Sequence, residues 1–127
     1  MEPTWKVIIS GDRSWSGPTI EEKIECLLLQ MPKRNGQWNV SVIHGACHGV
    51  DQSADKIAKK LGFQTLAFPA DWKRYGKAAG PIRNGQMLDM DNVYAVYAFH
   101  RDIGSSKGTK NILDQASKKG IPFYLFD

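Results

Sequence analysis

A short segment rich in glycine and hydroxyl groups precedes the last amphipathic stretch of the chain. It consists of Gly104, Ser105, Ser106, Lys107, Gly108 and Thr109. Glycine lets the backbone come close to a ligand, and the hydroxyl, ammonium and amide groups all donate hydrogen bonds. The amphipathic stretch that follows predicts a helix, whose free N-terminal N–H groups favour an anion. The segment is therefore a candidate phosphate-binding loop.

A second segment of this kind spans residues 44–51, with the sequence HGACHGVD. Gly45 and Gly49 permit backbone angles and close approaches that a Cβ atom would block. His44 and Asp51 add a titratable ring and a carboxylate, although Asp51 is equally suited to cap the helix that follows. All four residues are candidates for ligand binding.

Three potential metal ligands, His44, Cys47 and His48, lie close together in the same segment. Three such ligands would suffice for a catalytic zinc site. They fall within five consecutive residues, however, and the sequence shows no other ligand cluster. We therefore predict neither a metal nor a cofactor.

Arginines and aromatic residues occur in or just after the polar segments. Arg13 and Trp15 follow Gly11 near the start of the chain, and Arg83 precedes Asn84. Arginine is suited to bidentate contact with phosphate or carboxylate, although either arginine could simply be a surface residue. Trp15 could stack on a nucleobase or cover the edge of a sheet.

The elements that must position these residues follow from the spacing of the apolar residues. Strands are expected at residues 5–10, 40–43, 63–68, 93–99 and 121–126. Helices are expected at residues 19–31, 51–61 and 109–119, with a further one opened by Pro81. Strict alternation of strand and helix predicts βαβ units. We expect an α/β fold in a single Rossmann-like three-layer domain, with a mainly parallel sheet of about five strands and helices on both faces.

Local signals set the expected boundaries of these elements. Thr19 and Glu22 have the spacing of a capping box at the start of the first helix. Gly62 is suited to end the second helix, and Gly120 to end the last. Residues 32–38 are polar and predict a connection without regular structure.

The connections between elements differ sharply in length and composition. Those from helix to strand are mostly brief, whereas those from strand to helix are long and carry the candidate residues. Ligands bind beyond the carboxyl ends of the strands in open parallel sheets. We therefore predict that the candidate residues gather at that edge. Trp72 and Tyr75 also lie in these connections, where they could stack on a base or cover the edge of the sheet. A structural role is favoured for both.

Overall composition limits the classes of partner. The net charge is +4 and the isoelectric point is about 9.1, which suits an anionic ligand. The basic residues are spread along the chain, so single-stranded nucleic acid is a weaker candidate. No apolar run approaches the length that spans a bilayer, and the two cysteines form no disulfide framework. We expect a cytoplasmic protein without membrane contact.

Several motifs together resemble one family. The run FPADWKRYGKAAGPIRNGQML at residues 68–88 resembles the signature of the YspA and cpYpsA-related branch of the SLOG superfamily. Residues 8–15, 44–58 and 105–123 resemble other parts of the same branch. The resemblance implies a Rossmann-like fold with a site for a nucleotide or a nucleotide-derived molecule. Members of the superfamily include LOG phosphoribohydrolases, DprA-like proteins that bind single-stranded DNA, and nucleotide-sensing domains.

The comparison with LOG phosphoribohydrolases shows matches and one important departure. Arg83 matches the arginine of their Arg-Lys-x-x-Met motif, whereas Asn84 replaces the lysine. Gly108 and Thr109 match their phosphate loop. Ile112 stands where the resemblance places the catalytic glutamate, and an isoleucine can neither move a proton nor stabilise positive charge.

The missing glutamate favours binding over catalysis. We expect a sensor or ligand-binding module for a nucleotide or nucleotide-derived phosphorylated ligand. The alternative is an N-glycosidase of the phosphoribohydrolase type, with Arg83 and Asp51 as its working pair. Asp71 is a further candidate acid and ligand-binding residue. Self-association into a homo-oligomer stays open.

Overall fold

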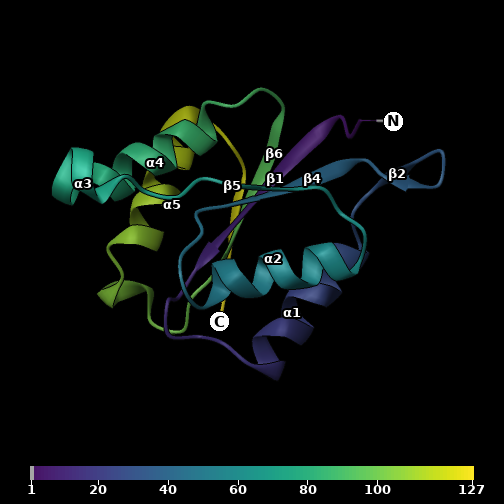
Figure 1. Cartoon of the computed structure of the whole chain (residues 1–127), viewed down its shortest axis with the longest axis horizontal. Helices are drawn as coiled ribbons and strands as arrows, with labels where there is room; N and C mark the ends of the chain where they lie inside the picture. Colours follow the sequence, from purple (N-terminus) through teal and green to yellow (C-terminus); the bar gives the residue numbers. More distant parts are fainter. Residues whose placement is uncertain (1) are drawn as a thin grey trace.

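The centre of the fold is a parallel sheet of five strands, seen in a computed structural model that describes residues 2–127 (Figure 1). Its strands are β1 (Trp5–Gly11), β4 (Val40–His44), β5 (Thr65–Ala67), β6 (Val93–Phe99) and β7 (Phe123–Phe126). Their order is β5-β4-β1-β6-β7, and every neighbouring pair is parallel. The chain thus builds outward from β1 on one side and then crosses to the other. This confirms the predicted Rossmann-like fold.

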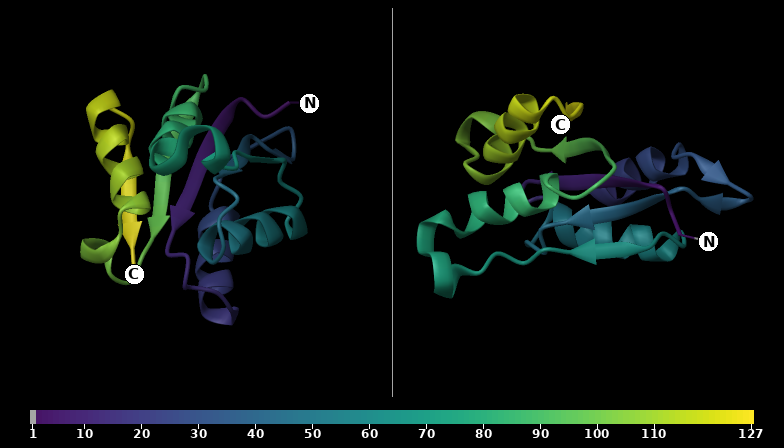
Figure 2. Two further views of the ribbon diagram at one scale, coloured as in Figure 1. Left: turned by 60° about the vertical axis from the view of Figure 1, so that its left-hand side comes forward. Right: turned by 90° about the horizontal axis from the view of Figure 1, so that it is seen from above.

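Helices cover both faces of the sheet. The long ones are α1 (Pro18–Leu29), α2 (Val50–Lys60), α4 (Ala79–Leu88) and α5 (Gly108–Lys119). Figure 2 shows α1 and α2 on one side of the sheet, and α4 and α5 on the other. No helix within the described residues is both long and apolar enough to cross a membrane.

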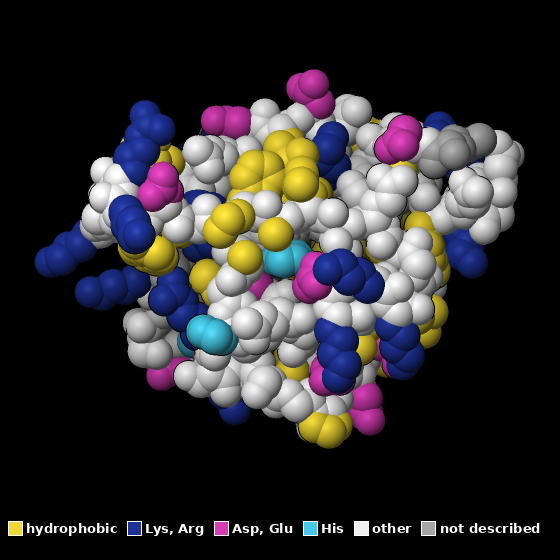
Figure 3. All heavy atoms as spheres, in the orientation of Figure 1, with side chains coloured by type: hydrophobic (Ala, Val, Ile, Leu, Met, Phe, Trp, Pro, Cys, Tyr) yellow, Lys and Arg dark blue, Asp and Glu magenta, His cyan; other side chains and the backbone are white. Residues whose placement is uncertain are grey.

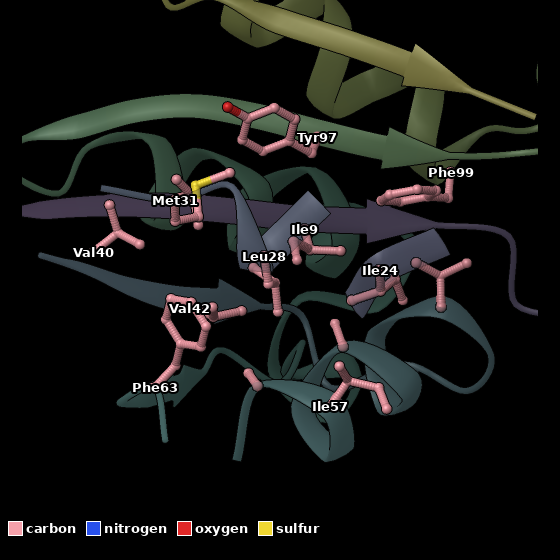
Figure 4. Close-up of a cluster of buried hydrophobic side chains, with 14 of the residues drawn as sticks. Ile9, Ile24, Leu28, Met31, Val40, Val42, Ile57, Phe63, Tyr97 and Phe99 are labelled. Carbon is pink, nitrogen blue, oxygen red and sulfur yellow. The ribbon is translucent and has the colours of Figure 1, made fainter. Parts of the chain in front are cut away.

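Two hydrophobic clusters hold the three layers together. On β1, Val7 and Ile9 belong to the cluster under α1 and α2, whereas Ile8 belongs to the cluster under α4 and α5. Both faces of β1 are therefore buried, which is why its sequence is a continuous apolar run. Figure 4 shows Ile24 and Leu28 of α1 pointing toward the strands, as their helical spacing predicts.

The start of α1 differs from the prediction. The helix begins at Pro18, after Gly17 with a φ of 99°, and no side chain caps it. Thr19 therefore lies inside the first turn, and the predicted capping box is wrong. The physical reason is Pro18, because its ring already has the φ of a helix and its missing N–H leaves one unpaired donor fewer at the helix start.

Residues 32–38, expected to be irregular, contain a small hairpin of β2 (Lys33–Arg34) and β3 (Gln37–Trp38). Its turn is Asn35-Gly36, with φ values of 53° and 77°. Asparagine followed by glycine favours this two-residue turn, because both positions need a positive φ. The hairpin delivers Trp38 to the core, where its ring stacks on Phe63 with 4.3 Å between centroids.

The third connection is also more structured than expected. A short helix, α3 (Trp72–Tyr75), and a 3₁₀ turn (Gly76–Ala78) lead into α4. Helix α4 begins two residues before Pro81, which lies within its first turn and therefore breaks no hydrogen bond. This short helical segment stands beside the carboxyl ends of the strands.

Candidate functional site

A cleft of about 950 Å³ opens at the carboxyl ends of β1, β4 and β6. Four segments line it: the connections after β1 and β4, the segment from α3 to α4, and the loop before α5. Eleven of the predicted residues are in its lining: Gly11, Arg13, Gly45, Asp51, Arg83, Asn84, Ser105, Ser106, Lys107, Gly108 and Thr109. A second hollow, of about 680 Å³ between α1 and β7, contains none of the predicted residues.

The first turn of α5 presents a free backbone donor to the cleft. Thr109 donates its amide to Ser106 Oγ at 3.1 Å, and Asn111 donates its amide to the Lys107 carbonyl at 3.0 Å. The amide of Gly108 meets no acceptor among the described residues. An unpartnered N–H at a helix N-terminus, beside the exposed Lys107 side chain, favours an anion at this point.

Arg83 is buried on α4, with only 5% of its surface exposed. Its Nε donates to Asn84 Oδ1 at 2.9 Å, and its Nη1 donates to the carbonyls of Gly45 at 2.5 Å and Phe68 at 3.4 Å. Within residues 2–127, its Nη2 meets only the thiol of Cys47, at 3.8 Å. The protein therefore holds Nε and Nη1 with oxygen acceptors and offers Nη2 only a weak sulfur acceptor.

Asn84 links α4 to the start of α5. Its side-chain amide donates to the Gly108 carbonyl at 3.3 Å and to Asn111 Oδ1 at 3.1 Å, while its oxygen accepts from Arg83. Each of its polar atoms is thus engaged within the protein. Asn84 lies in the cleft lining, and its contacts orient both Arg83 and the first turn of α5.

Asp51 is buried in the first turn of α2. Its Oδ2 accepts from the amides of Gly45 at 3.1 Å and Cys47 at 3.2 Å, which folds the loop after β4 over the helix. Its Oδ1 is buried without a partner among the described residues. Burial raises the pKa of the carboxyl, against the lowering effects of the Cys47 amide, His44 and Arg83. One oxygen is therefore left to meet a ligand.

Two glycines make the close approach of the loops possible. A Cβ atom on Gly11 would clash with the Phe99 carbonyl and lie 2.9 Å from Val50. Gly49 lies outside the lining, and a Cβ atom there would clash with the Asp12 carbonyl. Both positions are closed to any side chain, because carbonyl groups of the backbone cannot move aside.

Two predicted side chains, those of Trp15 and His44, are turned into the protein instead of the cleft. Trp15 is only 7% exposed and belongs to the core cluster under α1 and α2. His44 is buried, with its Nε2 bonded to Asp55 Oδ1 at 2.9 Å and its Nδ1 accepting from the Ala46 amide. Neither residue lines the cleft.

Asp71 and Gly104 also fall outside the lining. Asp71 caps α3, since its Oδ1 accepts from the Arg74 amide at 3.1 Å. Gly104 lies in a 3₁₀ turn before α5. Ile112, at the position of the LOG glutamate, is fully buried against the sheet. A glutamate at that position would lose its solvation without a partner.

Sequence reasoning missed several residues of the lining, among them Lys77 and Asp12, and it favoured a structural role for Trp72, which also lines the cleft. Asp12 accepts from the Ser14 amide at 2.8 Å and from Arg101 at 3.2 Å. Partial burial acts to raise its pKa, but these hydrogen bonds outweigh burial and leave the pKa lowered. An aspartate often accepts a hydrogen bond from the backbone amide two residues later and so forms a turn. The sequence around Asp12 offered this signal.

Figure 3 shows Lys and Arg side chains gathered where Figure 1 places α3.

The fold and the cleft define a Rossmann-like α/β domain with a polar site at the carboxyl ends of its strands. The chain belongs to the YspA, cpYpsA-related SLOG family, whose model matches residues 5–75. It is also similar to the Gene 61 protein of Mycobacterium phage D29, with 31% identity over 127 residues that cover 95% of each chain. No solved structure gives a significant match. The family resemblance expected from the motifs is confirmed.

Proposed function

We propose that the cleft binds a nucleotide or nucleotide-derived phosphorylated ligand, and that the chain is a sensor or ligand-binding module. The observation that carries the proposal is the convergence of donors from two helices. The free amide of Gly108, the Lys107 ammonium and Arg83 all belong to one cleft of about 950 Å³. Small-molecule sites commonly have a volume of this order. Membership of a SLOG family supports a nucleotide-related ligand.

The donors suggest how the ligand would lie. Its phosphate would accept from the Gly108 amide and pair with Lys107, with Nη2 of Arg83 adding a charge-assisted bond. The unpartnered Oδ1 of Asp51 would accept a hydrogen bond from a sugar hydroxyl. A phosphorylated sugar would thereby satisfy the one buried side-chain oxygen that lacks a partner within residues 2–127.

Lys107→Ala is expected to weaken AMP binding about tenfold, which corresponds to the loss of one charge-assisted hydrogen bond at an exposed position. Titration calorimetry measures this change. The matched control is Lys110→Ala, because Lys110 is exposed on the same helix but lies outside the cleft lining. Equal effects of the two substitutions would mean that Lys107 contributes only to the overall positive charge and makes no direct contact with the phosphate. Wild-type protein that binds none of AMP, GMP, CMP and UMP would overturn the proposed function.

A second candidate function is hydrolysis of the N-glycosidic bond of a nucleoside monophosphate. The observation that favours it is Asp51, a buried carboxyl with a raised pKa in the lining of the cleft. Such a group holds its proton to higher pH and is suited to protonate a leaving base. The candidate is weakened by Ile112, which leaves α5 without the carboxylate of LOG enzymes.

We expect no release of free base above background when the protein is incubated with AMP, GMP, CMP or UMP. A carboxylate near the ribose usually stabilises the developing positive charge, and loss of such a group costs roughly a hundred- to a thousandfold. Asp51 is a poor replacement, because its Oδ2 is already bonded to the Gly45 and Cys47 amides and burial raises the pKa of its carboxyl. Chromatography of the products tests this. Steady release that stops in Asp51→Asn, but continues in Asp71→Asn, would establish the second candidate.

A further inference from the structure

Trp72 is a large aromatic residue left in the open on the wall of the cleft. It lies in α3, and 51% of its surface is exposed. Its ring passes over Gly80 at the start of α4, where a Cβ atom would lie 3.5 Å from ring atom Cη2. Exposed tryptophan rings lose the large free energy of apolar burial, which a planar ligand could restore.

The other three tryptophans of the chain have partners within the protein. Trp15 is buried in the core, and Trp38 is stacked on Phe63. Trp5 packs edge-to-face on Tyr94, with 6.0 Å between ring centroids, at the start of β1 and thus at the opposite end of the sheet from the cleft. Only the Trp72 ring is part of the cleft lining.

Arg13 reaches across the cleft to this ring. The residue is exposed in the connection after β1, and its guanidinium carbon lies 5.9 Å from the centroid of the Trp72 ring. A planar group held between two others needs about 7 Å between them, because each stacking contact takes about 3.5 Å. A displacement of about 1 Å would therefore open the pair for a flat ring. Within residues 2–127, the Arg13 side chain makes this cation–π contact and no hydrogen bond or ion pair.

We propose that Trp72 and Arg13 form the subsite for an aromatic base of the ligand, with Trp72 as the stacking surface and Arg13 closing over the opposite face. This inference rests on the proposed function, and it deepens that function by assigning the residues that would recognise the base of the ligand. The two ends of the cleft then have separate tasks. The N-terminus of α5 and Arg83 hold the phosphate, and the short helix α3 holds the base.

The same arrangement predicts a preference among bases. Purines present a larger face to Trp72 than pyrimidines, and stacking on an aromatic side chain strengthens binding by about five- to a hundredfold per base. Arg13 adds attraction to the electron-rich face of the base, as it does now to the indole ring. AMP and GMP are therefore expected to bind more tightly than CMP and UMP.

The test compares AMP with ribose 5-phosphate, which has the same phosphate and sugar but no base. In Trp72→Ala, AMP affinity should fall by about five- to a hundredfold, whereas ribose 5-phosphate affinity should stay unchanged. Trp72→Phe should retain part of the affinity for AMP, which also covers the case of a poorly folded alanine variant. Trp5→Ala is the matched control, since Trp5 is also exposed but far from the cleft, and it should change neither affinity. Calorimetry supplies the affinities, and circular dichroism verifies the fold.

Each other result identifies a different failure. Unchanged AMP affinity in Trp72→Ala, or an equal loss for AMP and ribose 5-phosphate, would overturn the base subsite. Wild-type protein that binds ribose 5-phosphate as tightly as AMP would overturn the base subsite and leave the phosphate site standing. Wild-type protein that binds neither compound would overturn the proposed function itself, and the base subsite with it.

Discussion

Replacing Gly49 with alanine is expected to lower the free energy of unfolding by about 3 kcal/mol or more. Gly49 has a φ of 75°, and a Cβ atom there would clash with the Asp12 carbonyl and lie 2.6 Å from backbone atoms of Arg13. The Asp12 carbonyl also accepts the amide of Val50 at 3.2 Å, at the first residue of α2. The loop after β1 could move away only by breaking this bond. Urea denaturation monitored by circular dichroism measures the effect.

Gly62→Ala is the control, because it separates backbone strain from steric clash. Gly62 has a φ of 89°, yet no atom lies within 4 Å of the position that its Cβ would occupy. Alanine should therefore cost about 1 kcal/mol there, the usual penalty for a positive φ. Equal costs at the two positions would contradict the tight contact between the loops after β1 and β4.

Arg83→Ala is expected to weaken AMP binding at least tenfold and to lower the free energy of unfolding by about 2–4 kcal/mol. The loss of binding follows from Nη2, which faces only the weakly accepting thiol of Cys47 within the described residues and would bond more strongly to a phosphate oxygen. The loss of stability follows from the acceptors that lose Arg83 as a donor, which are Asn84 Oδ1 and the carbonyls of Gly45 and Phe68. Calorimetry and thermal unfolding measure the two effects separately.

Gly45→Ala tests the same inference without removing the charge. A Cβ atom on Gly45 would clash with Nη1 and lie 2.7 Å from the guanidinium carbon of Arg83, so the guanidinium must leave its position. AMP affinity should therefore fall in this variant as well. Arg74→Ala is the control, since Arg74 is exposed and lies over the Tyr75 ring. Unchanged AMP affinity in a folded Arg83→Ala protein would assign Arg83 to structure alone.

The order of elements was predictable because buried strands and helices require apolar residues at regular spacings, and these spacings can be recognised in the sequence. The central strands need apolar residues on both faces, so runs such as residues 93–99 were identified to the residue. Helix starts were less predictable, since they depend on which of several local signals prevails. At α1 the proline at position 18 prevailed over the capping residues Thr19 and Glu22.

The candidate site was predictable as a set of segments, but only partly as a set of side chains. Parallel topology brings the connections after β1, β4 and β6 to one edge, wherever their side chains point. Side-chain direction depends on tertiary packing. Trp15 thus enters the core, whereas Trp72, for which a structural role was expected, lies exposed in the cleft. The buried position of Arg83 also depends on tertiary packing, because its side chain contacts Gly45 and Phe68, which are distant in sequence.

The central place of β1 in the sheet has a consequence for synthesis of the chain. Strand β1 is synthesised before the strands it pairs with, which are β4 on one side and β6 on the other, where Gly11 aligns with Phe99. At roughly 5–20 residues per second, translation needs about 4–16 s to advance from the end of β1 to the start of β6. During that interval one edge of the apolar strand β1 has no partner. The nascent chain thus depends on early pairing of β1 with β4, and on the cover of α1 and α2, to avoid aggregation.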